Sequence, residues 1–130
     1  MARPRAGAPG RFRLTPASRI TRTRDIRELL RKGKRKKTSH LDVFFLSSPG
    51  SEPRFGLVVP KHRHSVVERN KVKRRLREIG RRDVLPRLRD EGVTADLLIR
   101  ARREAYGVGY QELRRELTEM IEGLCSGASS

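Results

Sequence analysis

The chain has 130 residues, of which 32 are lysine or arginine and 15 are aspartate or glutamate, giving a formal net charge of +17. This length predicts one domain with a single modest core, and no apolar stretch is long enough for a membrane span or for the core of a secretory signal. So much positive charge destabilises a compact chain by self-repulsion, so we expect a polyanionic partner. Nucleic acid is the first candidate, and an anionic membrane surface is the second.

Both ends of the chain are expected to be flexible. Residues 1–24 hold seven arginines and no acid, as in a mitochondrial presequence. Their prolines and glycines break any amphipathic helix, so we predict a flexible basic extension over residues 1–18. We also predict a flexible tail over residues 125–130. The single Cys125 has no partner for an internal disulfide, which fits a reducing, cytoplasmic setting.

The first ordered element is predicted to be a short helix between Thr23 as N-cap and Gly33 as C-cap. Its apolar side consists of three aliphatic residues, Ile26, Leu29 and Leu30. Two strands, Leu41–Leu46 and Arg54–Pro60, follow it. Because Ser47–Pro53 between them is rich in turn-forming residues, the pattern predicts an antiparallel hairpin.

The segment Lys61–Arg82 is the most informative part of the chain, because it holds ten lysines and arginines against two acids and still has the pattern of one ordered helix. Ser65 and Glu68 match a capping box, in which each residue satisfies the backbone N–H of the other. The helix is expected to end near Arg82, since Pro86 limits any continuation. At 3.6 residues per turn, its apolar face comprises Val72, Leu76 and Ile79. Its opposite, polar face comprises Asn70, Lys73, Arg74, Arg77 and Arg81.

This polar face has two interpretations. Many charged helix faces are simply solvated. Here, however, the row formed by Lys73, Arg77 and Arg81 has no acid at the i,i+4 positions, and like charges at that spacing repel one another unless an anion lies across them. The row therefore predicts a contact with nucleic acid phosphates.

A third strand is predicted at Asp96–Arg102, and a helix after Gly109. One stripe of that helix is apolar and should cover the core: Tyr110, Leu113, Leu117, Met120, Ile121 and Leu124. Its acids have the spacing of a solvent-facing side: Glu112, Glu116, Glu119 and Glu122. The order helix, strand, strand, helix, strand, helix predicts a single-domain α+β fold, with helices packed on a small sheet.

The residues of the chain do not match a catalytic or metal centre. The acids do not gather as they do in a metal-dependent nuclease. His62 and His64 lie near no cysteine, and no glycine-rich phosphate loop is present. We therefore expect a binding protein with no catalytic residue and no metal ligand of its own. Phe44, Phe45 and Phe55 offer surfaces for stacking single-stranded bases, although at least half of these rings are expected in the core.

The basic helix resembles the protein subunit of bacterial ribonuclease P. The family signature, R-N-[RK]-hydrophobic-K-R-x-hydrophobic-R, is matched by Arg69-Asn70-Lys71-Val72-Lys73-Arg74-Arg75-Leu76-Arg77. The segments RDIRELLRKG, RFGLVVPK, DLLIRAR and GYQELRRELTEM resemble the family's first helix, the strand before the signature, the strand ending in Ala-Arg and the terminal helix. The resemblance covers residues 19–124, which we take as the ribonuclease P protein domain.

The resemblance implies an α/β sandwich with a mixed sheet and a left-handed βαβ crossover, like the second domain of a ribosomal protein. It implies that the chain binds the catalytic RNA that removes the 5′ leader of precursor tRNA, and that this RNA and its Mg²⁺ ions perform the hydrolysis. Together with the cationic side of the helix, it predicts these RNA-binding residues: Lys61, Arg69, Asn70, Lys71, Lys73, Arg74, Arg77 and Arg81. The implied leader-binding cleft comprises Ile26, Leu30, Phe44 and Arg102.

The chain departs from the family pattern at several positions. Ile26 and Leu30 stand where the family commonly has two phenylalanines, which leaves Phe44 as the expected stacking ring. Lys71 replaces the more common arginine, and His64 replaces a glycine before the helix.

Two other functions remain open from sequence. A ribosomal-type RNA-binding protein would have the same charge pattern. A DNA-binding regulator would bind duplex DNA, but no helix-turn-helix pair or dimerising heptad accompanies the basic helix.

Overall fold

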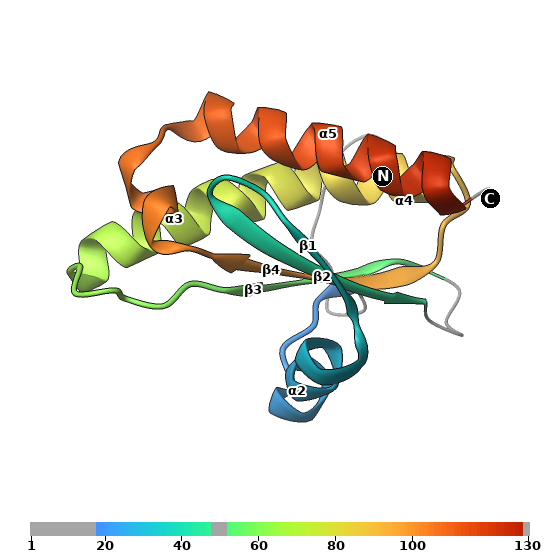
Figure 1. Ribbon diagram of the computed structural model, residues 1–130, viewed down its shortest axis with the longest axis horizontal. Coiled ribbons are helices and arrows are strands. Elements are labelled where there is room, and N and C mark those ends of the chain that lie inside the picture. The colour runs from blue at the N-terminus through green and yellow to red at the C-terminus, as the bar shows by residue number, and fades with distance from the viewer. Residues whose placement is uncertain (1–17, 48–51, 129–130) are drawn as a thin grey trace, which may run out of the picture.

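Figure 1 shows a computed structural model of the chain, which describes residues 18–47 and 52–128. A four-stranded sheet separates two layers of helices: α2 (Thr23–Lys32) lies on one face, and α3 (Val66–Ile79), α4 (Leu85–Asp90) and α5 (Tyr110–Ala128) lie on the other. This arrangement confirms the predicted α+β sandwich. The predicted extension over residues 1–18 falls almost entirely outside the described residues.

The sheet is built from β1 (Lys34–Lys37), β2 (Leu41–Ser47), β3 (Arg54–Val58) and β4 (Ala95–Ala101), in the order β1-β2-β4-β3. β2 pairs antiparallel with both β1 and β4, and β3 pairs parallel with β4. The predicted hairpin between β2 and β3 is therefore wrong, because β4 lies between them.

The position of β4 follows from its composition. Its residues Leu97, Leu98 and Ile99 are fully buried, so side chains on both faces of this strand must be covered. An inner strand meets this need, because helices pack on both faces of the sheet there. By contrast, β1 reads KRKK, and all of its side chains are exposed. It has no apolar signal in the sequence, and lysines are typical of an edge strand that must not pair with another chain. The hairpin of this protein is the β1–β2 unit.

The connection from β3 through α3 to β4 joins two parallel strands. In Figure 1 both strands run from right to left, α3 lies above the sheet, and β4 lies nearer to the viewer than β3. The crossover is therefore left-handed, as the resemblance implied, and it belongs to the rare exceptions to the right-handed rule.

The helical path does not end before Pro86. After α3, a π-helical turn over Gly80–Val84 leads directly into α4, which carries Pro86 in its first turn. A proline is tolerated better in the first turn of a helix than in its interior, and its fixed φ suits that position. The apolar face continues through this junction, and it buries Val84, Leu85 and Leu88.

Gly80 is required at this junction by a close approach. A Cβ built on Gly80 would lie 2.3 Å from the ring of Phe55 in β3. The wide turn of the π-helix thus packs its backbone against an aromatic ring, and this contact holds the end of α3 on the sheet.

The two faces of the sheet have cores of different size. The larger core lies under α3, α4 and α5, and the smaller one lies under α2. The smaller core consists of Ile20, Leu29, Phe44 and Leu98. Because successive strand residues point to opposite faces, Phe44 belongs to the α2 side, whereas Phe45 packs against the larger core.

The helix ends agree with the predictions only in part. The capping box of α3 is present, and Gly33 donates its N–H to the carbonyl of Leu29 at the end of α2. Thr23 is not the N-cap, because Arg22 occupies that position without a side-chain cap. The last helix, α5, runs four residues past the expected domain end at Leu124. Within residues 18–47 and 52–128, no helix has the length and apolar character needed to cross a membrane.

Candidate nucleic-acid interface

The basic helix α3 is held in place from both its end and its underside. At its N-terminus, Ser65 Oγ accepts from the N–H of Glu68 at 3.1 Å, and Glu68 Oε1 accepts from the N–H of Ser65 at 2.9 Å. The backbone hydrogen bond from Ser65, with further contributions from the Ser65 and His64 side chains, lowers the pKa of Glu68. Underneath, Val72, Leu76 and Ile79 are at most 2% exposed. The helix therefore presents its polar side in one defined orientation.

We call that polar side the α3 ridge and define it by these residues: Asn70, Lys71, Lys73, Arg74 and Arg77. All of them except Lys73 are exposed, and Lys73 is half-buried. Among the described residues, no acid forms an ion pair with Lys71, Lys73, Arg74 or Arg77. The ridge thus keeps its positive charge uncompensated within the folded chain, as the sequence predicted.

Two of the predicted RNA-binding residues have internal partners. Arg69 donates from Nε to the carbonyl of Val59 at 2.7 Å, which ties α3 to the end of β3. Arg81 donates to Glu78 at 2.6 Å, and this hydrogen bond is the main cause that lowers the pKa of Glu78. Arg81 has no acid at the i,i+4 spacing that the sequence prediction considered, whereas Glu78 reaches it at i,i+3. Arg69 and Arg81 therefore use some of their N–H donors for hydrogen bonds within the chain.

A groove of about 250 Å³ runs between the ridge and α2. Lys73 and Arg77 line one wall, and Ile26 from α2 lines the other, with Leu57 and Gly56 from β3 between them. α2 is held at this distance by Arg54, which donates two hydrogen bonds to Asp96 and lies 3.7 Å from Asp25 of α2. The groove combines an aliphatic wall with a cationic wall.

The predicted leader-binding residues do not meet in one cleft. Ile26 lines the groove beside the ridge, and Leu30 is exposed on α2. Arg102 lines a separate hollow of about 430 Å³, and its Nη1 donates to the carbonyls of Thr38 and Ser39. Phe44 is only 5% exposed. Its prediction as a stacking ring is wrong, because α2 and the packing around Ile20 cover it.

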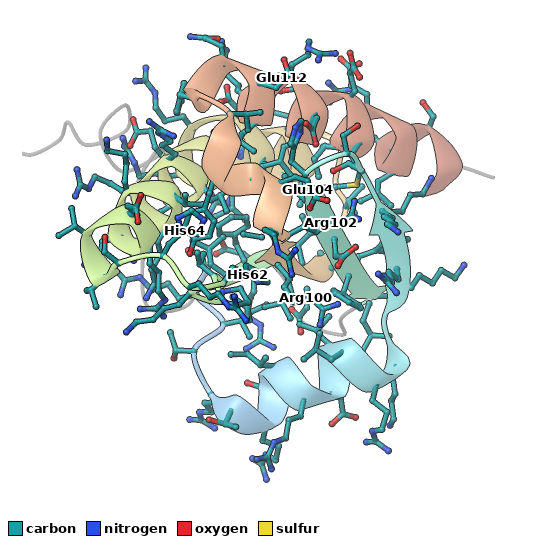
Figure 2. All side chains as sticks on the ribbon, turned by 60° about the vertical axis from the view of Figure 1, so that its left-hand side comes forward. His62, His64, Arg100, Arg102, Glu104 and Glu112 are labelled. Carbon is teal, nitrogen blue, oxygen red and sulfur yellow. The ribbon has the colours of Figure 1, made fainter. Side chains whose placement is uncertain are left out.

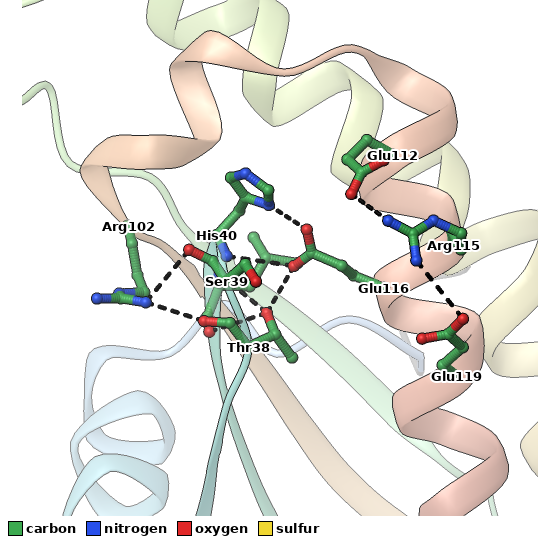
Figure 3. A network of polar contacts seen from close by, with 9 residues as sticks. Thr38, Ser39, His40, Arg102, Glu112, Arg115, Glu116 and Glu119 are labelled. Atoms are coloured by element: carbon green, nitrogen blue, oxygen red, sulfur yellow. Dashed lines mark hydrogen bonds and ion pairs between the residues drawn. The ribbon is translucent and has the colours of Figure 1, made fainter.

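The hollow at the end of the sheet brings Arg102 together with Arg100, a residue that the sequence did not single out. Figure 2 shows His62, Arg100 and Arg102 near one another there, and the three residues line the same hollow. The guanidinium of Arg100 lies 5.2 Å from the centre of the Phe44 ring and donates to Asp42 at 3.2 Å. The position of Arg100 could have been predicted from the alternation of β4, because Arg100 must point to the same face of the sheet as Leu98.

The loop before α3 has an unusual backbone. His62 and Arg63 both have positive φ angles, 49° and 71°. His64, at the position where the family commonly has glycine, stacks on Tyr106 with ring centres 3.9 Å apart. Tyr106 in turn donates to the carbonyl of Pro60 at 2.6 Å, and burial raises the pKa of its hydroxyl. The loop is therefore pinned against the 3-10 helix Arg103–Gly107, while Lys61 remains exposed at its start.

Comparison with known proteins agrees with these features. Residues 14–125 match the model of the ribonuclease P family. A ribonuclease P protein component from Thermus oshimai is 42% identical over 72% of this chain and 56% of its own length. The chain thus spans about half the length of the Thermus relatives that it matches. A ribonuclease P protein component from Syntrophobacter fumaroxidans is 32% identical over 83% of this chain and 88% of its own length.

Solved structures agree at the level of the fold. The ribonuclease P protein of Staphylococcus aureus matches with a TM-score of 0.68 and 22% identity, over 82% of this chain and 94% of that chain. The protein from Thermotoga maritima matches with a TM-score of 0.68 and 24% identity, over 79% of this chain and 94% of that chain.

Proposed function

Because the chain belongs to the ribonuclease P protein family, we propose that it binds a large catalytic RNA and assists the removal of the 5′ leader from precursor tRNA. In this proposal the RNA holds the catalytic Mg²⁺ ions and performs the phosphodiester hydrolysis. The chain supplies binding surfaces and no catalytic group. It works in the cytoplasm, where precursor tRNA is processed, and it takes no small-molecule substrate.

The observation that carries this proposal is the uncompensated charge of the α3 ridge. Because the other face of α3 is buried, the helix keeps these cationic side chains on one side of the molecule, where they repel one another. Phosphates lying across Lys73, Arg74 and Arg77 relieve this repulsion and release their own counterions, which favours binding. The same charges screen the repulsion between the precursor and the catalytic RNA, so the complex needs less Mg²⁺.

The leader is proposed to lie in the groove between α2 and the ridge. Its phosphates would face Lys73 and Arg77, and its bases would pack against Ile26 and Leu57. Aliphatic walls offer bases less stacking energy than aromatic rings do, so this groove should discriminate little between leader sequences. Arg102, in the separate hollow, would contact RNA beyond the groove.

Reconstitution tests the proposal. The full-length chain is added to its cognate ribonuclease P RNA, and precursor tRNA cleavage is measured over a range of Mg²⁺ concentrations. We expect the chain to lower the Mg²⁺ concentration that gives half-maximal cleavage. The same Mg²⁺ dependence with and without the chain would reject the proposal. The chain alone should leave precursor tRNA intact, and cleavage by protein free of RNA would overturn the assignment of catalysis to the RNA.

A ribosomal-type RNA-binding protein is the alternative that the ridge also fits. The RNA that copurifies with the chain separates the two functions, since ribosomal RNA would favour this alternative. Competition with duplex DNA tests a DNA-binding regulator, which would prefer a defined DNA sequence over precursor tRNA.

A further inference from the structure

Glu116 departs from the expected pattern of α5. The sequence places it among solvent-facing glutamates, but the residue is only 8% exposed, because the turn between β1 and β2 covers it. Its Oε1 accepts from Thr38 Oγ1 at 2.7 Å and from the N–H of His40 at 3.2 Å. Its Oε2 faces Nδ1 of His40. The prediction of a solvated Glu116 is therefore wrong.

A second carboxylate lies beside this pair. Glu112, one turn earlier on α5, places a carboxylate oxygen so that it, His40 Nδ1 and an oxygen of Glu116 all lie within 4.8 Å of one another. The three groups come from two elements that are far apart in the sequence. Within residues 18–47 and 52–128, this is the place where side chains able to ligate a metal converge.

We propose that His40, Glu112 and Glu116 bind a divalent transition metal ion, with Zn²⁺ as the best match. Zn²⁺ accepts an imidazole nitrogen together with carboxylate oxygens, and sites with three protein ligands leave a position for water. Mg²⁺ and Ca²⁺ prefer oxygen ligands throughout, so the imidazole disfavours both. Two carboxylates also balance the charge of a divalent cation in a chain that is otherwise strongly basic.

The local contacts prepare Glu116 for this role. Thr38 and the backbone of His40 hold Oε1, so Oε2 is the atom left to face the ion. Hydrogen bonds of this kind orient a ligand and are commonly found behind the ligands of metal sites. Burial of Glu116 also makes a cationic partner more favourable than it would be for an exposed carboxylate.

Binding requires two small rearrangements: the ion must replace the direct contact between His40 Nδ1 and Glu116 Oε2, and Glu112 must move toward them. Metal–ligand bonds of about 2.1 Å hold ligand atoms roughly 3.4 Å apart at a tetrahedral angle, so Glu112 must turn inward from its present position. Glu112 now accepts from Arg115, whose other nitrogen lies 3.7 Å from Glu119. Arg115 is exposed and keeps Glu119 as a partner, so the release of Glu112 leaves no buried charge behind.

The ion would join the β1–β2 turn to α5. Arg102 donates to the carbonyls of Thr38 and Ser39 in that same turn. A metal ion at His40 would therefore also stabilise the backbone that holds Arg102. This inference does not depend on the proposed function, because it can be tested without RNA.

A hydrogen bond between His40 and Glu116 is the competing explanation for their close contact. With a hydrogen on Nδ1, His40 donates to Glu116, and the network is complete without a metal. The two explanations differ in what Zn²⁺ does to the folded chain. A metal site binds Zn²⁺ through His40, whereas a protonated pair gains nothing from it.

The test uses the full-length chain purified with a chelator and then dialysed at pH 7.5. Melting temperature is measured with and without a small molar excess of Zn²⁺, and Co²⁺ is titrated while its visible absorption is recorded. We expect Zn²⁺ to raise the melting temperature by several degrees, and Co²⁺ to develop the absorption bands of a low-coordinate nitrogen and oxygen site. Both effects should be lost in H40Q and weakened at least tenfold in affinity in E112Q.

His64→Gln is the matched control, because His64 also contacts a glutamate, Glu68, at i,i+4, but belongs to no group of three metal-ligating side chains among the described residues. The control should bind Zn²⁺ like the wild type. An unchanged melting temperature in the wild type overturns the proposal, as does a Zn²⁺ effect that survives in H40Q. If H40Q folds poorly, NMR line broadening by Mn²⁺ in the wild type decides the case. Broadening centred on His40 and Glu116 supports the site, and broadening elsewhere overturns it.

Discussion

The helices α3 and α5 pack on the same face of the sheet (Figure 1), but their outward sides treat charge in opposite ways. On α5, Arg115 lies between Glu112 and Glu119, and Arg114 donates to Asp83 at 3.1 Å. On α3, the cations of the ridge have no acid partner among the described residues. One helix neutralises its charges within the chain, and the other leaves them for an external anion.

This difference separates a solvated face from a binding face. Paired surface charges contribute little to stability and attract no polyanion. A row of unpaired charges of one sign weakens the isolated fold slightly and favours association with phosphates. The buried side chains Val72, Leu76 and Ile79 anchor α3 to the core and so keep this row of charges on one side of the molecule.

The largest effect should come from removing that anchor. Leu76→Ala deletes a fully buried side chain below the ridge, and we expect it to lower the free energy of unfolding by about 2–5 kcal/mol. Urea unfolding measures this change. Leu30→Ala, at a position 36% exposed on α2, is the control and should cost less than about 1 kcal/mol. Equal losses would mean that α3 is not anchored through this face.

A smaller effect is expected where arginines do have a buried acid partner. Asp42 accepts from Arg35 and Arg100. Burial raises the pKa of Asp42, but the hydrogen bonds from the two arginines outweigh it and hold the pKa below the usual 3.8. The ionised form is thus favoured by folding. Its contribution is present above about 3.8 and is lost as the pH falls through the lower pKa of the folded state.

Asp42→Asn should therefore lower the free energy of unfolding by about 1–2 kcal/mol at pH 7, since both arginines remain partly solvated. The difference from the wild type should shrink as the pH falls below 3.8. Urea unfolding between pH 7 and pH 3 measures it. A difference that stays constant over this range would show that the charge of Asp42 is not the cause.

The smallest changes in stability distinguish the two helices directly. Arg74→Glu on α3 relieves repulsion from Lys71 and Arg77 but places an acid four residues before Glu78. These effects oppose each other, so the unfolding free energy should stay within about 0.5 kcal/mol of the wild type, while RNA binding weakens clearly. Arg115→Glu on α5 places an acid between Glu112 and Glu119, which should cost about 0.5 kcal/mol and leave RNA binding nearly unchanged. Melting curves and filter binding measure both. Equal loss of RNA affinity in the two variants would contradict the distinction.

The sequence predicted the parts of the fold that depend on local pattern. The capping box at Ser65 and the buried stripe of Val72, Leu76 and Ile79 follow from neighbours along one helix, and both are present. β1 could not be predicted in this way, because KRKK has no apolar residue, and its pairing with β2 depends on a strand that lies later in the chain. The central position of β4 follows from a competition among strands that no single segment contains.

The site residues show the same limit. The ridge is a property of one helix, so its orientation followed from helical periodicity. The burial of Phe44 and of Glu116 depends on α2 and on the β1–β2 turn, which cover these residues from distant parts of the chain. The i,i+4 spacing gives Arg81 no acid partner, and the one it has, Glu78, lies at i,i+3.

We attribute the unpaired charges of the ridge to contacts with RNA phosphates. The most direct test measures the affinity of the cognate ribonuclease P RNA over a range of salt concentrations for the wild type, for Lys73→Ala with Arg77→Ala, and for Lys34→Ala with Lys36→Ala. Both variants lose two charges, but the second loses them from the exposed edge strand β1. We predict that the ridge variant binds more weakly and that its plot of log affinity against log salt is shallower by about 1 to 2, while the β1 variant matches the wild type. Equal slopes and affinities for the two variants would contradict the account.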